Sequence, residues 1–190
     1  MTLKTWLRTE YVPILLVILM TITRYHHFGD VLHLPDASLA VFFFAGFYRK
    51  KALLGFLLVL AGVIDYLAIA NGTSSYCVSP GYVFLIPTYA IMWFVARQWA
   101  SLRLTSWRQL ATSAAWLLVA SGLAFVVSNV GFYGFSGKFA DLSLWVYSTR
   151  VAQFLPLYLA STVVYGLLVW AGVHGLETLL GHKPQQGKTE

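Results

Sequence analysis

The chain has one cysteine, Cys77, in a polar segment of turn-forming residues, NGTSSYCVSP (71–80). A lone thiol in a membrane protein is commonly inert and buried, whereas a thiol in a polar loop is open to ligands and oxidants. Soft sulfur suits a soft or borderline metal, and coordination favours the thiolate. One thiol holds a free ion weakly, but it can supply one axial ligand to a metal that a macrocycle already holds. Both interpretations of Cys77 stay open at this point.

Two further groups could act beside the thiol. His26 and His27 are adjacent, so they cannot both face one ligand from the same helix face, and we expect at most one to bind metal. Asp65 lies near the end of an apolar run, where a carboxylate usually faces the protein interior and has a partner. It either pairs with Arg24 or Arg150, or it accepts hydrogen bonds at the floor of a pocket.

Aromatic side chains gather in the segments between the apolar runs. Such residues are usually interfacial anchors, but aromatic walls with a few polar groups also suit a pocket for a large, flat, partly apolar molecule. Gly131, Gly134 and Gly137 recur every third residue and predict a flexible segment that could close over a ligand. The candidates for this pocket are His33, Asp36, Tyr76, Tyr82, Phe132, Tyr133, Phe135 and Trp145.

The composition indicates the class of fold that holds these residues in place. Of 190 residues, 58% are hydrophobic and only 11% are charged, which excludes both an ordinary soluble domain and a disordered chain. The chain has room for six membrane helices of about 20 residues each and little else. We predict an all-α integral membrane protein with a single domain of six transmembrane helices over 1–180 and a polar tail over 181–190. The predicted spans are 11–23, 36–48, 52–70, 81–96, 109–130 and 144–173.

Lysine and arginine predict the orientation, because these residues stay on the cytoplasmic side of span ends. With both termini cytoplasmic, Arg24, Lys138 and Arg150 lie outside, and ten basic residues lie inside. The histidines, Cys77 and the glycine-rich segment then share the outer face. The net charge of +6 is spread between apolar runs, so we expect no nucleic-acid partner. The inner residues are Lys4, Arg8, Arg49, Lys50, Lys51, Arg97, Arg103, Arg108, Lys183 and Lys188.

Three stretches carry a family resemblance: LPDASLAVFFFAGFY (34–48), VIDYLAIANG (63–72) and YCVSPGYVFLIPTYA (76–90). They resemble the BtuM family, solitary cobalamin-specific S-components of energy-coupling-factor (ECF) type vitamin transporters, over nearly the whole chain. The most specific shared element is the cysteine before the fourth helix. The resemblance implies uptake of cobalamin (vitamin B12) from the outer face, at the bacterial inner membrane, with a site that faces the periplasm or exterior.

The resemblance also implies roles for single residues. Cys77 becomes the axial ligand of the cobalt, with the nucleotide base of cobalamin displaced, and the other substrate-binding candidates surround it. An electron-donating thiolate would labilise the opposite axial group, so Cys77 is also the candidate catalytic residue for removal of cyanide. The other candidates are Asp65, Tyr76, Tyr82, Tyr133 and one of His26 and His27.

The expected partners are the corrinoid and the lipid bilayer. S-components that dock on a shared energising module typically carry an alanine-xxx-alanine motif on the first helix, which VPILLVILMTIT (12–23) lacks. We therefore expect no dedicated energising module and no cofactor beyond cobalamin as substrate. Two alternatives remain: a small membrane enzyme with a cysteine nucleophile and a histidine base, and an assembly subunit whose aromatic outer face binds another protein.

Overall fold

The computed structural model describes residues 3–27, 35–48, 51–100 and 106–180, apart from the side chains of 3–10, 26, 27, 77 and 177–180. Over this part of the chain the protein is all-helical, as the composition predicts, and it contains no strand. Its α helices are α1 (Leu3–His27), α2 (Ser38–Phe47), α3 (Lys51–Ala70), α4 (Leu85–Trp99), α5 (Trp107–Phe135), α6 (Leu144–Ala152) and α7 (Leu155–Leu180), and its 3-10 helices are η1 (Ser75–Cys77) and η2 (Pro80–Phe84).

Three of these helices are long and apolar enough to cross a membrane: Lys51–Ala70, Trp107–Phe135 and Leu155–Leu176. Two shorter apolar helices, Tyr11–Tyr25 and Ser38–Phe47, accompany them. A bilayer core is about 30 Å thick and a helix rises about 1.5 Å per residue, so the ten residues of α2 cannot cross it alone. Length and composition thus indicate a membrane protein.

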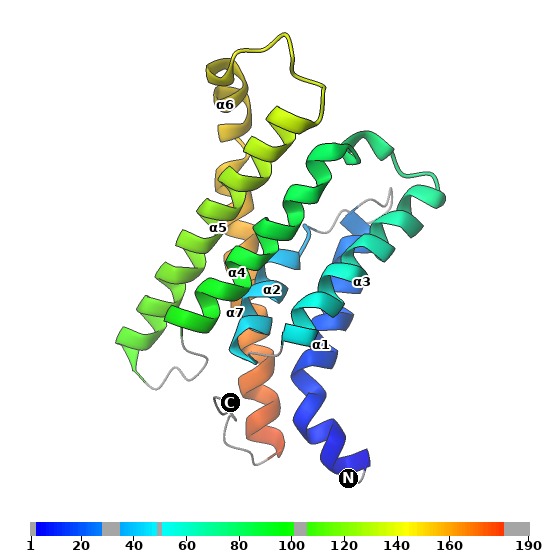
Figure 1. Ribbon diagram of the computed structural model, residues 1–190. Coiled ribbons are helices and arrows are strands. Elements are labelled where there is room, and N and C mark those ends of the chain that lie inside the picture. Colours follow the sequence, from blue (N-terminus) through cyan, green and yellow to red (C-terminus); the bar gives the residue numbers. More distant parts are fainter. Residues whose placement is uncertain (1–2, 28–34, 49–50, 101–105, 181–190) are drawn as a thin grey trace.

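Figure 1 shows that α1 begins and α7 ends at one end of the bundle. The segment between α3 and α4, which holds η1 and η2, lies at the other end together with α6. The cysteine turn and the segment after α5 are therefore neighbours in space, as the sequence predicts for the outer face.

Helix α2 is the centre of the bundle, because every one of its ten residues is buried. It packs against α1, α4 and α7. The ring of Phe42 stacks on Tyr89 of α4, with centroids 4.3 Å apart and planes 4° from parallel. Gly46 allows the close approach, because a Cβ at this position would collide with the backbone carbonyl of Trp93. A helix this short and apolar is stabilised by its neighbours rather than by its own propensity.

Local signals in the sequence explain several helix ends. An aspartate just before an apolar run predicts a helix cap, and Asp36 precedes the second helix in this way. Its Oδ1 does accept a hydrogen bond from the Ser38 backbone N–H at 2.9 Å, although the N-cap itself is Ala37. The predicted last span is interrupted: α6 ends at Ala152 and α7 begins at Leu155, directly before Pro156. A proline is tolerated in the first helical turn but disfavours a helical residue before it, which explains the break.

The prediction of a flexible glycine segment over 131–137 is wrong. Helix α5 continues to Phe135, so Gly131 and Gly134 are helical, and only Gly137 has a left-handed backbone, with φ of +71°. Gly131 serves packing instead, because a Cβ there would collide with the ring of Phe84. A Cβ on Gly81 would lie 2.9 Å from the Gly131 carbonyl oxygen, so η2 lies directly against α5.

The remaining predictions on spans have mixed outcomes. In the fifth span, alanines four residues apart predict close packing of another helix, at Ala111 and Ala115 and at Ala120 and Ala124. Ala120 and Ala124 are indeed fully buried, but Ala111 and Ala115 are exposed. Of the basic residues predicted to be cytoplasmic, Arg49, Lys50, Arg103, Lys183 and Lys188 lie outside the described residues, as does the predicted tail 181–190.

Candidate functional site

A buried arginine organises the end of the bundle where η1 and η2 lie. The Arg24 guanidinium of α1 binds Asp65 of α3 in a two-point contact, from Nε to Oδ1 at 2.7 Å and from Nη2 to Oδ2 at 2.6 Å. Its Nη1 also donates to Asp36 Oδ2 at 2.8 Å. Arg24 and Asp65 are 4% and 5% exposed, so this ion pair is withdrawn from solvent. The prediction that Asp65 pairs with Arg24 or Arg150 is confirmed for Arg24.

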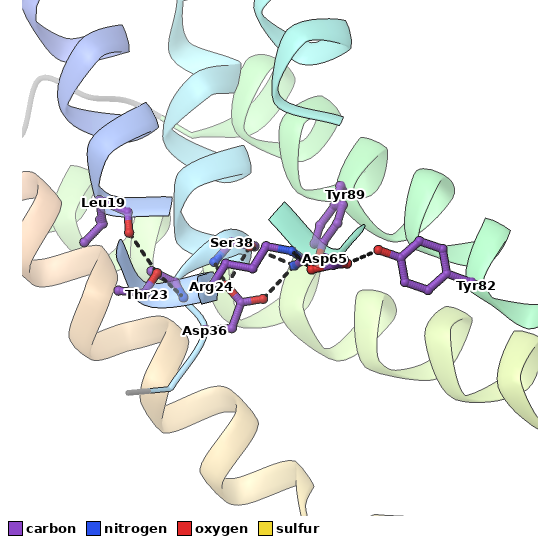
Figure 2. A network of polar contacts seen from close by, with 9 residues as sticks. Leu19, Thr23, Arg24, Asp36, Ser38, Asp65, Tyr82 and Tyr89 are labelled. Carbon is purple, nitrogen blue, oxygen red and sulfur yellow. Dashed lines mark hydrogen bonds and ion pairs between the residues drawn. The ribbon is translucent and has the colours of Figure 1, made fainter. Parts of the chain in front are cut away.

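Neutral groups complete the coordination of Arg24. Its Nη1 also donates to the Tyr89 hydroxyl oxygen at 2.7 Å and to Ser38 Oγ at 3.1 Å. Ser38 Oγ in turn donates to Asp36 Oδ1 at 2.6 Å, which holds that carboxylate at the start of α2. Figure 2 shows these side chains converging from α1, α2, α3 and α4 on the one guanidinium. The network therefore fixes four helices against each other.

The turn that follows Cys77 is tied to the same network. The Tyr82 hydroxyl of η2 donates a hydrogen bond to Asp65 Oδ2, the same oxygen that accepts from Arg24 Nη2 (Figure 2). Asp65 thus accepts from both an arginine and a tyrosine. This confirms that Asp65 is a hydrogen-bond acceptor as well as an ion-pair partner, and it brings together two residues that the resemblance implies for the pocket.

The network forms one wall of a partly open cavity of about 640 Å³. The charged lining residues are Arg24, Asp36 and Asp65, so one positive and two negative charges leave a formal charge of one negative unit. Pockets for small molecules usually enclose about 300–1,000 Å³ and combine apolar walls with a few fixed polar groups. The rest of the lining is Pro35, Leu39, Gly81, Tyr82, Phe84, Leu85, Thr88, Tyr89, Ser128, Asn129, Phe132, Phe154, Leu157, Tyr158 and Ser161.

Aromatic contacts join two loops beside the cavity. The Tyr76 ring of η1 meets Phe132, a lining residue, edge to face with centroids 6.4 Å apart. Lys138, from the segment after α5, places its Nζ 3.6 Å from the centroid of the same Tyr76 ring. Such a cation–π contact contributes about 0.5–1 kcal/mol at an exposed site. Tyr76 thus links the cysteine turn to the segment that connects α5 and α6.

Tyr133 has a structural role in this arrangement. Its hydroxyl donates to the Leu142 carbonyl at 2.8 Å and so holds the α5–α6 connection, and Tyr133 is absent from the cavity lining. The Tyr147 hydroxyl lies 3.1 Å from Asn129 Oδ1, which orients a polar lining residue of α5. Tyr133 therefore holds the α5–α6 connection, and its predicted contact with a ligand stays a prediction.

The structure describes only part of the residues that the sequence predicts as metal ligands, Cys77 and the histidines. The backbone of Cys77 ends η1, but its side chain and those of His26 and His27 lie outside the described residues, as does all of His33. Within the described part of the chain, no group of three or more histidine, cysteine, aspartate or glutamate side chains could hold a metal ion.

Sequence reasoning missed several lining residues. It placed Arg24 on the outer side at the end of the first span and considered it as a partner of Asp65, but it did not predict that Arg24 is buried and lines a cavity. It also missed Ser128, Asn129 and Ser161, although a polar pair inside an apolar span is a recognised signal for a site that faces the protein interior. Tyr89 carries no such signal, because a tyrosine in a span is ordinarily an anchor.

No protein-family model matches the chain, and no curated protein matches it at a significant level. The fold and the site geometry are therefore the observations on which a function rests, beside the sequence motifs.

Proposed function

We propose that the protein captures cobalamin in the cavity and carries it across the bacterial inner membrane. The observation that carries the proposal is the cavity itself, which is open, largely apolar and bounded by the turn that follows Cys77. Tyr82, Phe84 and Phe132 give it the aromatic surface that a flat macrocycle needs. A corrinoid is large, so part of it would remain at the mouth, against Tyr76 and the α5–α6 connection.

Cys77 is well placed in the chain to act on such a ligand. Cys77 ends η1, and Gly81, four residues later, lines the cavity. Four residues span at most about 14 Å, so the backbone of Cys77 lies within that distance of the lining. In this proposal the Cys77 thiolate coordinates cobalt axially, because the corrin ring supplies the in-plane ligands and leaves one position for a single protein sulfur.

The same coordination would release cyanide from cyanocobalamin. The Cys77 thiol gives its proton to water, and its sulfur donates an electron pair to cobalt in place of the displaced nucleotide base. The cyanide on the opposite face then leaves with its own bonding pair. The oxidation state of cobalt is unchanged, so the exchange needs no reductant. In this role Cys77 is the catalytic residue, and the released anion is the product to measure.

The charged network gives the site a fixed wall. Arg24, Asp36 and Asp65 satisfy one another, so they can form a rigid polar surface without reorganising when a ligand arrives. Three helices suitable for spanning support membrane placement. In the proposal the chain crosses six times with both termini cytoplasmic, and the residues on either side of α2 complete the second crossing. The site then faces the periplasm, and the protein works without a dedicated energising module.

The test is retention of cobalamin by the purified protein in detergent. The protein is incubated with cyanocobalamin and desalted, and the visible corrin spectrum of the protein fraction is recorded. We expect stoichiometric corrin in the wild type, loss in Cys77→Ala, and retention in Ser75→Ala, a control in the same turn. Free cyanide should appear with the wild type, and retained cyanide at full occupancy would overturn the exchange step.

The other outcomes separate the two alternatives. Absence of retained corrin in the wild type would refute the cobalamin proposal. A turnover that is lost in Cys77→Ala without any bound chromophore would then favour a small membrane enzyme with a cysteine nucleophile. An unchanged phenotype in Cys77→Ala would favour an assembly subunit that uses its aromatic outer surface.

A further inference from the structure

The charged wall of the cavity offers a ligand acceptors rather than donors. Its residues Arg24, Asp36 and Asp65 leave a formal charge of one negative unit. Arg24 is 4% exposed, and its Nε, Nη1 and Nη2 atoms all donate to partners within the network. The Asp36 side chain is 25% exposed, so the accessible part of this wall is mainly carboxylate. A ligand in the cavity therefore meets a carboxylate whose cation is already committed.

Neutral polar groups from α5 and α7 extend the same pattern. Ser128 and Ser161 line the cavity, and each hydroxyl donates its proton to a backbone carbonyl of its own helix, at 3.0 and 3.1 Å. A serine hydroxyl has one proton and two acceptor lone pairs, so only acceptor capacity is left. Asn129 is oriented by its neighbours, since its Nδ2 donates to the Phe125 carbonyl at 2.8 Å and its Oδ1 accepts from the Tyr147 hydroxyl at 3.1 Å. One Nδ2 hydrogen and one Oδ1 lone pair of Asn129 remain for a ligand.

These donors and acceptors decide which chemical groups the cavity can hold. A primary amide is neutral and brings two N–H donors, which can pair with the free acceptors. A carboxylate brings only acceptors and a further negative charge, so it would be buried beside Asp36 without a partner. A buried charge without a partner costs more than a neutral group that lacks one hydrogen bond. The lining therefore favours an amide over a carboxylate at the same position of a ligand.

Two basic residues at this end of the bundle lie outside the lining. Lys138 is exposed and holds its Nζ 3.6 Å from the centroid of the Tyr76 ring, and Arg150 is exposed on α6. Neither residue lines the cavity, so they can attract an anion to its mouth but cannot pair with one inside. An anionic group of a ligand is therefore expected to stay at the mouth.

We propose that the cavity selects ligands whose peripheral side chains are amides and rejects the corresponding carboxylates. This inference rests on the proposed function, because it names the form of corrinoid that the same site takes. A corrinoid carries several carboxamide side chains around its ring, and the proposal selects the fully amidated form over one with free acids. Asp36, Ser128, Asn129 and Ser161 are then residues that determine specificity.

The test compares three forms of one ligand. Cyanocobalamin is hydrolysed at one propionamide to the monocarboxylate, and part of that product is converted to its methyl ester, which is neutral but has no N–H donor. The dissociation constant of each form is measured by equilibrium dialysis against the purified protein in detergent, for three propionamide positions. Only the side chains that enter the cavity are sensitive. At one or more positions we expect the carboxylate to bind at least about ten-fold more weakly than the amide, with the ester between them.

A pair of charge variants assigns the discrimination to the lining. Asp36→Asn brings the formal charge of the lining to zero, and one unit charge about 4 Å away in water changes an affinity about five-fold. We therefore expect Asp36→Asn to reduce the ratio of carboxylate to amide dissociation constants about five-fold at the sensitive position. Asp141→Asn is the matched control, because Asp141 is exposed on the α5–α6 connection and is absent from the lining. This control should leave the ratio unchanged.

The outcomes separate this inference from the proposed function. Equal binding of amide and carboxylate at all three positions, with cyanocobalamin retained, would overturn the inference and leave the proposed function standing. Equal effects of Asp36→Asn and Asp141→Asn on the ratio would also overturn it, because overall charge would then explain the discrimination. If the wild type retains no cyanocobalamin, the proposed function itself is refuted.

Discussion

Removing the positive charge of Arg24 should destabilise the protein more than any other single change in the charged network. Arg24→Met leaves the buried Asp65 and the partly exposed Asp36 without their cation. Breaking a buried ion pair from one side costs about 3–5 kcal/mol, because an uncompensated charge remains. Asp65 is only 5% exposed and loses two contacts, at 2.6 and 2.7 Å, so we expect the upper part of that range.

Removing the charge of Asp65, the other half of the ion pair, should lower the free energy of unfolding less than removing the charge of Arg24. Asp65→Asn removes one negative charge from a site with one positive and two negative charges, so the remaining Arg24 and Asp36 balance each other. The loss is then that of charge-assisted hydrogen bonds, about 1.5–3 kcal/mol. Which of the two variants loses more free energy of unfolding, rather than either value alone, distinguishes an effect of charge from a simple loss of packing.

The assay is equilibrium unfolding of the purified protein in mixed micelles, followed by circular dichroism. Arg150→Met is the control, because this exposed arginine should change the free energy of unfolding by less than about 0.5 kcal/mol. A loss in Arg24→Met no larger than in Arg150→Met would refute the reasoning. A larger loss in Asp65→Asn than in Arg24→Met would show that the network is not short of positive charge.

Two further substitutions test how η2 is held. Gly131→Ala should lower the free energy of unfolding by about 1–3 kcal/mol, since its Cβ would collide with Phe84, whereas Gly134→Ala, with open space around it, should not destabilise the protein. Equal thermal stability of these two variants would contradict the close packing of η2 on α5. Tyr82→Phe removes the hydroxyl that binds Asp65 and should cost about 1–3 kcal/mol in the same unfolding assay, because a charged acceptor loses a donor. An unchanged unfolding midpoint would mean that this contact does not hold the turn.

The sequence predicts much of the fold, because its main signals are one-dimensional. Apolar runs between basic residues identify the helices, and Pro156 marks the break before α7. The sequence could not predict that Gly131 and Gly134 are helical, because glycine in a polar, aromatic segment also favours a loop. Only the neighbouring ring of Phe84 shows why a residue without a side chain is needed at 131.

The site was predictable in its parts but not in its arrangement. Asp65 could be identified because a carboxylate in a span needs a partner, and Arg24 was one of two partners considered. The convergence of Tyr89, Ser38 and Asp36 on that arginine depends on how α1, α2 and α4 pack, which no local pattern contains. The hydrogen bond from Tyr133 to the Leu142 carbonyl, which holds the α5–α6 connection, could not be predicted from the sequence either, because it depends on how that connection folds back on α5.

The central claim is that Cys77 binds the cobalt of a corrinoid held in the larger cavity. Cobalt X-ray absorption on the desalted complex tests this claim most directly, because it reports the atoms bound to the metal. We predict a sulfur neighbour of cobalt in the wild type, and its loss in any corrinoid that Cys77→Ser retains. A wild-type complex whose cobalt has only nitrogen, oxygen or carbon neighbours would contradict the account.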